Sequence, residues 1–122
     1  MEHCDLLTEI LKIENTRFVG MYNMNMEKIT DGYRADIIPH LSREEYQDSV
    51  RYDIRRWETY KMFQNQLGIA KFAMVKFENA TLLTFAIAND EYLRVSIEPD
   101  INYRDVIEEI QEILRKENFI QP

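Results

Sequence analysis

Three side chains in this chain of 122 residues carry an imidazole or a thiol group, namely His3, Cys4 and His40. A protein metal site usually needs three or four such ligands, and a nucleophilic cysteine needs a base that a third group holds in place. Two histidines and one cysteine do not meet either requirement. We therefore expect no metal site and no nucleophilic cysteine, and we interpret Cys4 as a buried side chain and the histidines as surface residues.

Carboxylates are dense in the last helical segment, and their spacing of four residues places them on one solvent-facing side of a helix. They are Asp105, Glu108, Glu109 and Glu112. General acid–base catalysis needs a cleft that shifts the pKa values of such groups, and no pattern here indicates one. The three glycines are isolated, which excludes the glycine-rich loops of nucleotide-binding sites. No catalytic, cofactor-binding or metal-binding residue is predicted, and the chain is not expected to be an enzyme.

The most distinctive polar side chains are the basic ones of a long helical segment, where five acidic and five basic residues lie between positions 43 and 61. Three readings stay open for this cluster: a surface of salt bridges along one helix, a site for an acidic partner or bound anion, and a nucleic-acid site. The first is supported by acidic residues three positions away, at the spacing that pairs charges on a helix. The basic residues are Arg51, Arg55, Arg56 and Lys61, and the acidic ones are Asp48, Asp53 and Glu58.

Two aromatic residues of the same segment, Trp57 and Tyr60, belong to its apolar stripe. Such residues are more often core than site, but a long helix extends beyond what one sheet face covers, and exposed aromatic surface would then mark an interface. The candidate interface of the chain is therefore Arg51, Arg55, Arg56, Trp57, Tyr60 and Lys61.

Charge and composition narrow the classes of partner and compartment. The net charge is −7, so nucleic acid is a disfavoured partner. No apolar run approaches the ~20 residues of a membrane span, and the first residues lack the pattern of a signal peptide. A single cysteine cannot form an internal disulfide, which fits a reducing compartment. We expect a soluble cytoplasmic protein with no membrane partner and no cofactor.

Hydrophobic periodicity predicts eight elements in one domain covering residues 1–122. The strands joined by short turns favour a mainly antiparallel five-stranded sheet with helices on both faces, an α+β fold. The strand over 28–33 is expected at an edge, the strand over 81–87 at the centre, and the strand over 92–97 with one exposed face. The predicted helices are 2–13, 42–68 and 103–117, and the predicted strands are 17–22, 28–33, 71–77, 81–87 and 92–97.

The longest of these helices has the clearest boundaries. Ser42 and Glu45 have the capping-box spacing at its start, and Gly68 supplies a residue that adopts left-handed conformations at its end. Seven apolar or aromatic residues then hold one face over the whole segment: Tyr46, Val50, Ile54, Trp57, Tyr60, Phe63 and Leu67.

The element order α-β-β-α-β-β-β-α resembles the roadblock/dynein light chain fold, which is similar to profilin-like and longin domains. The whole chain also resembles a small family of uncharacterised archaeal proteins, through the short segments 17–20, 66–68, 71–74 and 98–101. The roadblock resemblance implies a non-catalytic homodimer in which a sheet edge and the long helix pair with their copies, and which often docks a small Ras-like GTPase. The polar, arginine-rich helix departs from that family pattern.

Two hypotheses of function follow, from different classes. The first is an interaction or adaptor module, a homodimer that docks a regulatory protein such as a small GTPase through an acidic partner surface. The alternative is a profilin-like or PAS-like sensor of a small ligand, which needs a cavity between the sheet and a helix. We expect such a cavity to be lined by Phe18, Phe72, Met74 and Phe85.

Overall fold

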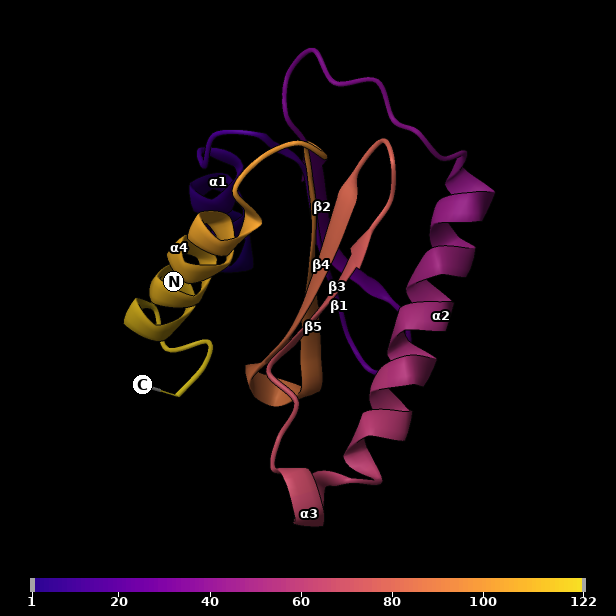
Figure 1. Ribbon diagram of the computed structural model, residues 1–122, viewed down its shortest axis with the longest axis vertical. Helices are drawn as coiled ribbons and strands as arrows, with labels where there is room; N and C mark the ends of the chain where they lie inside the picture. Colours follow the sequence, from indigo (N-terminus) through magenta and orange to yellow (C-terminus); the bar gives the residue numbers. More distant parts are fainter. Residues whose placement is uncertain (1, 122) are drawn as a thin grey trace.

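The computed structural model describes residues 2–121 and contains a five-stranded antiparallel sheet between two layers of helices (Figure 1). The strand order in the sheet is β2-β1-β5-β4-β3. In chain order the elements are α1 (His3–Leu11), β1 (Thr16–Tyr22), β2 (Lys28–Tyr33), α2 (Arg43–Lys61), α3 (Gln64–Leu67), β3 (Phe72–Lys76), β4 (Thr81–Ile87), a short 3-10 turn (Ala88–Asp90), β5 (Glu91–Ile97) and α4 (Tyr103–Lys116). The α+β fold class and the sequential order of helices and strands are as predicted.

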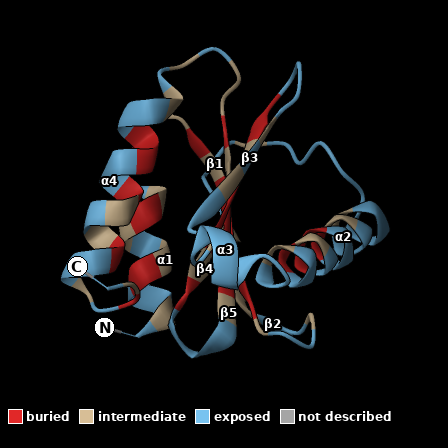
Figure 2. Ribbon diagram, turned by 60° about the horizontal axis from the view of Figure 1, so that its bottom comes forward, coloured by how far each residue is buried: buried red, intermediate tan, exposed pale blue. Residues whose placement is uncertain are grey.

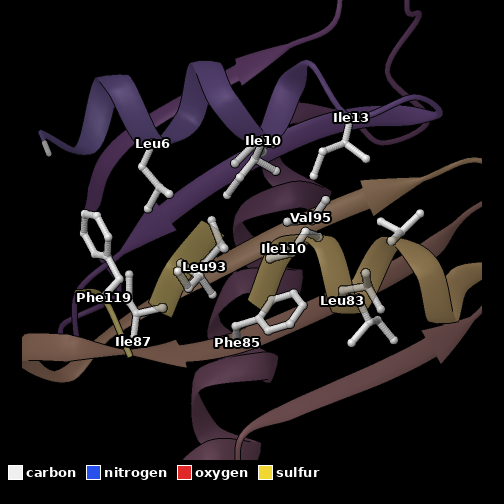
Figure 3. Close-up of a cluster of buried hydrophobic side chains, with 14 of the residues drawn as sticks. Leu6, Ile10, Ile13, Leu83, Phe85, Ile87, Leu93, Val95, Ile110 and Phe119 are labelled. Carbon is white, nitrogen blue, oxygen red and sulfur yellow. The ribbon is translucent and has the colours of Figure 1, made fainter. Parts of the chain in front are cut away.

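Two hydrophobic clusters hold the layers together, one on each face of the sheet. The larger lies under α1 and α4, where Leu6, Ile10 and Ile110 meet Leu93 and Val95 of the central strand (Figure 3). The smaller lies under α2 and joins Val50, Ile54 and Trp57 to Tyr22 and Tyr92. The helices α1, α2 and α4 each bury one stripe of residues and leave the opposite side exposed, as Figure 2 shows for α2 and α4.

The long helix begins as predicted but ends earlier. Ser42 and Glu45 form both hydrogen bonds of the capping box. The prediction of one continuous helix to Gly68 was wrong, because α2 stops at Lys61 and a separate single turn, α3, follows. Beyond Lys61 the apolar stripe of the helix no longer packs against the sheet, since Phe63 and Leu67 are 50% and 82% exposed. Without such packing the helix is not stabilised beyond this point.

The prediction that β4 is the central strand, with β5 half exposed, was also wrong. β5 is the centre of the sheet, and both of its faces are covered: Leu93 and Val95 under α1 and α4, Tyr92 and Arg94 under α2. Tyr, Arg and Ser alternate with apolar residues in β5, a pattern typical of a strand with one solvent-exposed face. The polar side is buried instead, because Arg94 has a buried acidic partner, Asp53.

The two edges of the sheet are β2 and β3, and they differ in chemistry. β2 was predicted as an edge, and its sequence places Lys28 and Asp31 along it. β3 is more apolar, with Phe72 and Met74 exposed, and its one charged residue, Lys76, lies at its end. Charged residues on an edge strand discourage pairing with another chain, so β3 is the less protected of the two edges.

Candidate functional site

Thiol and imidazole groups do not assemble into a site in this structure. Within residues 2–121, no group of three or more His, Cys, Asp or Glu side chains is placed to hold a metal ion. Cys4 is exposed, so the interpretation of a buried cysteine was wrong; it lies in the first turn of α1, whose buried stripe is formed by Leu6 and Ile10. His3 contacts Glu91, with 2.7 Å between Nε2 and Oε1, and His40 lies beside Arg17.

The carboxylates of α4 lie on its solvent side. Asp105, Glu108, Glu109 and Glu112 are all exposed, while Val106, Ile107, Ile110 and Leu114 of the same helix face the core. Asp105 accepts a hydrogen bond from the Asn102 side chain at the start of the helix. These four groups have no enclosed cleft in common, and the arrangement is that of a solvated helix face.

The six candidate interface residues of α2 divide into a buried and an exposed set. Trp57 is only 3% exposed, because its ring packs against Tyr60 and Tyr92 between the helix and the sheet. Tyr60 is half-buried beside it. Arg51 and Arg55 are exposed on the outer side of the helix, whereas Lys61 is exposed at the end of the helix beside Asp90.

Two of the ion pairs expected from helical spacing are present, and a further one joins α2 to another element. Arg51 donates to Asp48 and Arg56 donates to Asp53, at 3.0 and 3.1 Å. Lys61 lies 3.9 Å from Asp90 of the turn before β5. Of the four basic candidate residues, Arg55 is the one for which no ion pair is found within residues 2–121.

A buried polar cluster beneath α2 is the feature that sequence reasoning missed. Asp53 is 8% exposed and accepts hydrogen bonds from Arg94 Nε, Thr84 Oγ1 and Arg56 Nη2 at 2.7, 2.9 and 3.1 Å. Arg94 also donates from Nη2 to Ser49 Oγ at 3.0 Å. The cluster fixes α2 over the middle of the sheet through specific hydrogen bonds, whereas the apolar contacts around it are not directional.

Two tyrosines extend this cluster toward β1. The hydroxyls of Tyr22 and Tyr46 are hydrogen-bonded to each other, and the Arg94 guanidinium lies 5.3 Å from the centre of the Tyr46 ring. Burial raises the pKa of Tyr22 to about 12 and also raises the pKa of Tyr46. Gly20 is required at this point, since a Cβ atom there would lie 2.7 Å from the Tyr22 hydroxyl and 2.9 Å from that of Tyr46.

An apolar surface runs along the free edge of β3 and the segment that precedes it. Phe72 and Met74 are 41% and 37% exposed on the side of the sheet that α4 covers elsewhere, opposite Phe85 and Leu83 of β4. Phe63, Leu67 and Ile69 before the strand are also exposed. We call Phe63, Leu67, Ile69, Phe72 and Met74 the β3 edge surface.

A cleft of about 710 Å³ lies between the first half of α2 and the sheet. The segment between β2 and α2 and the turn between β3 and β4 enclose its sides. Of the four residues expected to line a ligand cavity, Phe18 does so here, whereas Phe72 and Met74 lie on the β3 edge surface and Phe85 lies in the larger core cluster. That expected set was therefore wrong, because alternate residues of a strand face opposite sides of the sheet.

Several solved structures have a similar arrangement of helices and strands. The chain aligns with a roadblock/LC7 domain from Streptomyces avermitilis at a TM-score of 0.71, covering 95% of this chain and 94% of the other, with 8% identity. The gliding protein MglB from Thermus thermophilus gives a TM-score of 0.72 over 94% and 87% of the two chains, with 10% identity. MglB from Myxococcus xanthus gives 0.67 over 95% and 96%, with 11% identity. The fold is a roadblock fold.

This similarity is one of structure. No family model matches the chain, and the curated proteins contain no match to it by sequence. One similar structure is described as MglB with a tetrameric arrangement, at a TM-score of 0.66 and 11% identity. Among the residues that the structure describes, no helix has the length and apolar character needed to cross a membrane.

In this chain the roadblock fold positions three distinct features. The β3 edge surface lies at one end of the sheet, the exposed basic residues lie on the outer side of α2, and the buried cluster of Asp53 and Arg94 lies between α2 and the central strand. The first two are surfaces that a protein can contact, and the third adjoins the cleft.

Proposed function

We propose that this chain is a non-catalytic interaction module that forms a homodimer and docks a regulatory protein such as a small GTPase. The observation that carries the proposal is the β3 edge surface, where an unpaired strand edge coincides with exposed apolar side chains. An edge of this kind pairs with another strand through main-chain hydrogen bonds, and its apolar neighbours then become buried.

A second copy of the chain is the proposed occupant of that edge. Two copies related by a two-fold axis place β3 beside β3, so that the two sheets join and the same surface on each chain covers the other. The tetrameric arrangement of one similar protein and the homodimer implied by the roadblock resemblance support this choice. The opposite edge is less suited, because β2 carries Lys28 and Asp31.

The proposed dimer is tested by one substitution at each edge of the sheet. Met74→Lys introduces a charge into the β3 edge surface and is expected to give a folded monomer, since a buried unpaired ammonium is unfavourable in an apolar interface. Met24→Lys is the matched control, because Met24 is 42% exposed against 37% for Met74 and lies in the turn before β2. Sedimentation velocity on both variants distinguishes the two edges.

A Met74→Lys variant that stays dimeric removes the β3 edge from the interface. If Met24→Lys is the variant that becomes monomeric, the dimer uses the opposite edge.

The outer side of α2 is the proposed docking surface for the regulatory protein. Arg51 and Arg55 are exposed there and suit a partner with an acidic surface. Of the other candidate residues, Trp57 is buried, Arg56 is held by Asp53 and Lys61 lies at the helix end beside Asp90. Arg55→Glu is therefore expected to weaken binding of a Ras-like GTPase from the same organism by about tenfold, the effect of ~1.4 kcal/mol. Binding is measured by biolayer interferometry with the GTPase loaded with GTP or GDP.

Thr59→Glu is the control for this experiment, since Thr59 is exposed on the same helix one turn away from Arg55. This variant changes the net charge by −1, against −2 for Arg55→Glu. If Thr59→Glu loses half or more of the binding free energy that Arg55→Glu loses, net charge, and not Arg55, governs docking. Absence of binding by every GTPase tested would remove that partner class while leaving the dimer test unaffected.

A further inference from the structure

The single carboxylate of the buried cluster beneath α2 pairs with two arginines. Asp53 contacts Arg94, whose side chain is 6% exposed, and Arg56, whose side chain is 30% exposed and keeps part of its hydration. Arg94 is 5% exposed, and its Nη1 has no hydrogen-bond partner within residues 2–121. Arg56 Nε is likewise buried without a partner. Buried donors are nearly always paired, so an unpaired guanidinium nitrogen calls for a physical reason.

Arg94 is also a wall residue of the cleft between α2 and the sheet. The volume of this cleft, about 710 Å³, falls within the roughly 300–1,000 Å³ of small-molecule sites. Its other walls are largely apolar, with Phe18, Ile37, Leu41 and Leu82 among them. A site of this kind fits a ligand that has an apolar body and one polar group.

The remaining charges of the cleft leave Arg94 as its innermost cation. Arg17 is paired with Glu98, with 2.6 Å between Nη1 and Oε1. Glu45 and Glu78 also line the cleft, but both are exposed to water, which screens their charge. The buried end of the cleft therefore presents the Arg94 guanidinium, whose counter-ion Asp53 is shared with Arg56.

We propose that this cleft binds a small organic monocarboxylate, with its carboxylate hydrogen-bonded to Arg94 Nη1 and its apolar body against Phe18 and Leu82. The single unpartnered Nη1 donor suits a single carboxylate, and the planar guanidinium is the side chain best suited to that group. Apolar walls disfavour a more highly charged ligand such as a phosphate ester.

Entry of the carboxylate requires one side-chain movement. Nη1 is covered from solvent, and the Tyr46 ring lies over the guanidinium while forming part of the cleft wall. Tyr46 is held there by the hydroxyl of Tyr22 and by contact with Phe18, at 4.9 Å between ring centres. Rotation of the Tyr46 ring away from Arg94 opens the nitrogen to the cleft.

The test compares matched acids and amides on the unmodified chain. Octanoate and hydrocinnamate are titrated at constant ionic strength against ¹⁵N-labelled protein, followed by nuclear magnetic resonance, with octanamide and hydrocinnamide as uncharged counterparts. The acids are expected to shift the backbone amide signals of Ser49 and Ser96, which line the cleft. The amides are expected to bind at least about tenfold more weakly, because a hydrogen bond between charged groups is lost.

A variant that fills the cleft then locates the site. Ser96→Leu places a larger side chain in the cleft wall and leaves Arg94 and Asp53 themselves unsubstituted, and it is expected to abolish carboxylate binding. Thr8→Leu is the control, since Thr8 is exposed on α1 at the opposite face of the sheet. Equal binding of acids and amides, signals that move only outside the cleft, or no binding of either acid at millimolar concentration would each overturn the proposal.

The proposal is separate from the dimer. The cleft lies under the first half of α2, and none of the five residues of the β3 edge surface lines it. Carboxylate binding by the Met74→Lys variant is expected to equal that of the unmodified chain, so the two proposals fail or succeed independently.

Discussion

Asp53 joins two elements that are far apart in the sequence. It lies on α2 and accepts from Arg94 and Thr84 of the central strands as well as from Arg56 one turn away. Replacement by alanine leaves the buried Arg94 guanidinium and the partly exposed Arg56 guanidinium without a counter-charge. Asp53→Ala is therefore expected to lower the free energy of unfolding by about 3–5 kcal/mol. Urea denaturation measures the change.

Asp48→Ala is the matched control for that variant. Asp48 also pairs with an arginine three positions later, but its side chain is 74% exposed and water screens the pair. Loss of the Asp48–Arg51 pair is expected to lower the free energy of unfolding by less than about 1 kcal/mol. Similar costs for the two variants would mean that the buried cluster contributes no more than a surface ion pair.

The hydrogen-bonded pair of Tyr22 and Tyr46 predicts a dependence of stability on alkaline pH. Burial raises both pKa values above the ordinary 10.0 of tyrosine, that of Tyr22 to about 12. Between pH 10 and pH 12 the unfolded chain therefore loses protons that the folded chain retains, and the free energy of unfolding falls as the pH rises. The double variant Tyr22→Phe, Tyr46→Phe is expected to show a smaller fall in urea denaturation across this range.

Tyr52→Phe controls for the alkaline prediction, because Tyr52 is 67% exposed. This variant is expected to keep the slope of the unmodified chain. An unchanged slope in the double variant would assign the alkaline loss of stability to other groups.

The sequence predicted one half of the Asp53 cluster and could not predict the other. The pair of Asp53 and Arg56 follows from helical spacing alone. The pair of Asp53 and Arg94 depends on which strand lies beneath α2, and that is a property of the sheet order. The signal in the sequence that could have indicated this pair is an arginine between two apolar residues of a strand. The alternating pattern was instead interpreted as one solvent-exposed face of the strand.

At the scale of elements, α2 shows which boundaries local chemistry determines. Its start is fixed by the capping box of Ser42 and Glu45, which is a local pattern and was predicted. Its end depends on where the sheet stops supporting the apolar stripe, since Phe63 and Leu67 repeat at helical spacing but contact no core. Periodicity alone therefore extended the predicted helix beyond Lys61 to Gly68.

The capping box at the start of α2 leads to a prediction for the stability of the protein. Ser42→Ala removes the hydrogen bond to the Glu45 backbone N–H and is expected to lower the free energy of unfolding by about 1 kcal/mol. The backbone N–H of Ser42, and then its hydroxyl, lower the pKa of Glu45 below its ordinary 4.5. The stabilisation that the ionised Glu45 carboxylate gives to the capping box is therefore present above pH 4.5. It is lost as the pH falls through the folded-state pKa of Glu45.

Urea denaturation of Ser42→Ala and of Thr59→Ala, an exposed position within α2, checks the prediction at neutral and acidic pH. A cost for Ser42→Ala no greater than that for Thr59→Ala would show that the helix does not depend on its cap.

At the scale of the whole molecule, element order was enough to indicate the roadblock fold, while strand order was not. Turn lengths identify which strands are hairpin partners, but the pairing of β1 with β5 joins distant segments, and only the assembled core decides it. The β3 edge surface follows from that order, because β3 becomes an outer strand. The six candidate interface residues were chosen without it, which is why they include the buried Trp57.

The proposed association of two copies through the β3 edge surface is tested most directly by the mass in solution at micromolar concentration, measured by light scattering on a sizing column. The expected value is twice the chain mass of 14.7 kDa. A mass of 14.7 kDa at every concentration tested would contradict it, and the exposed edge of β3 would then need another occupant.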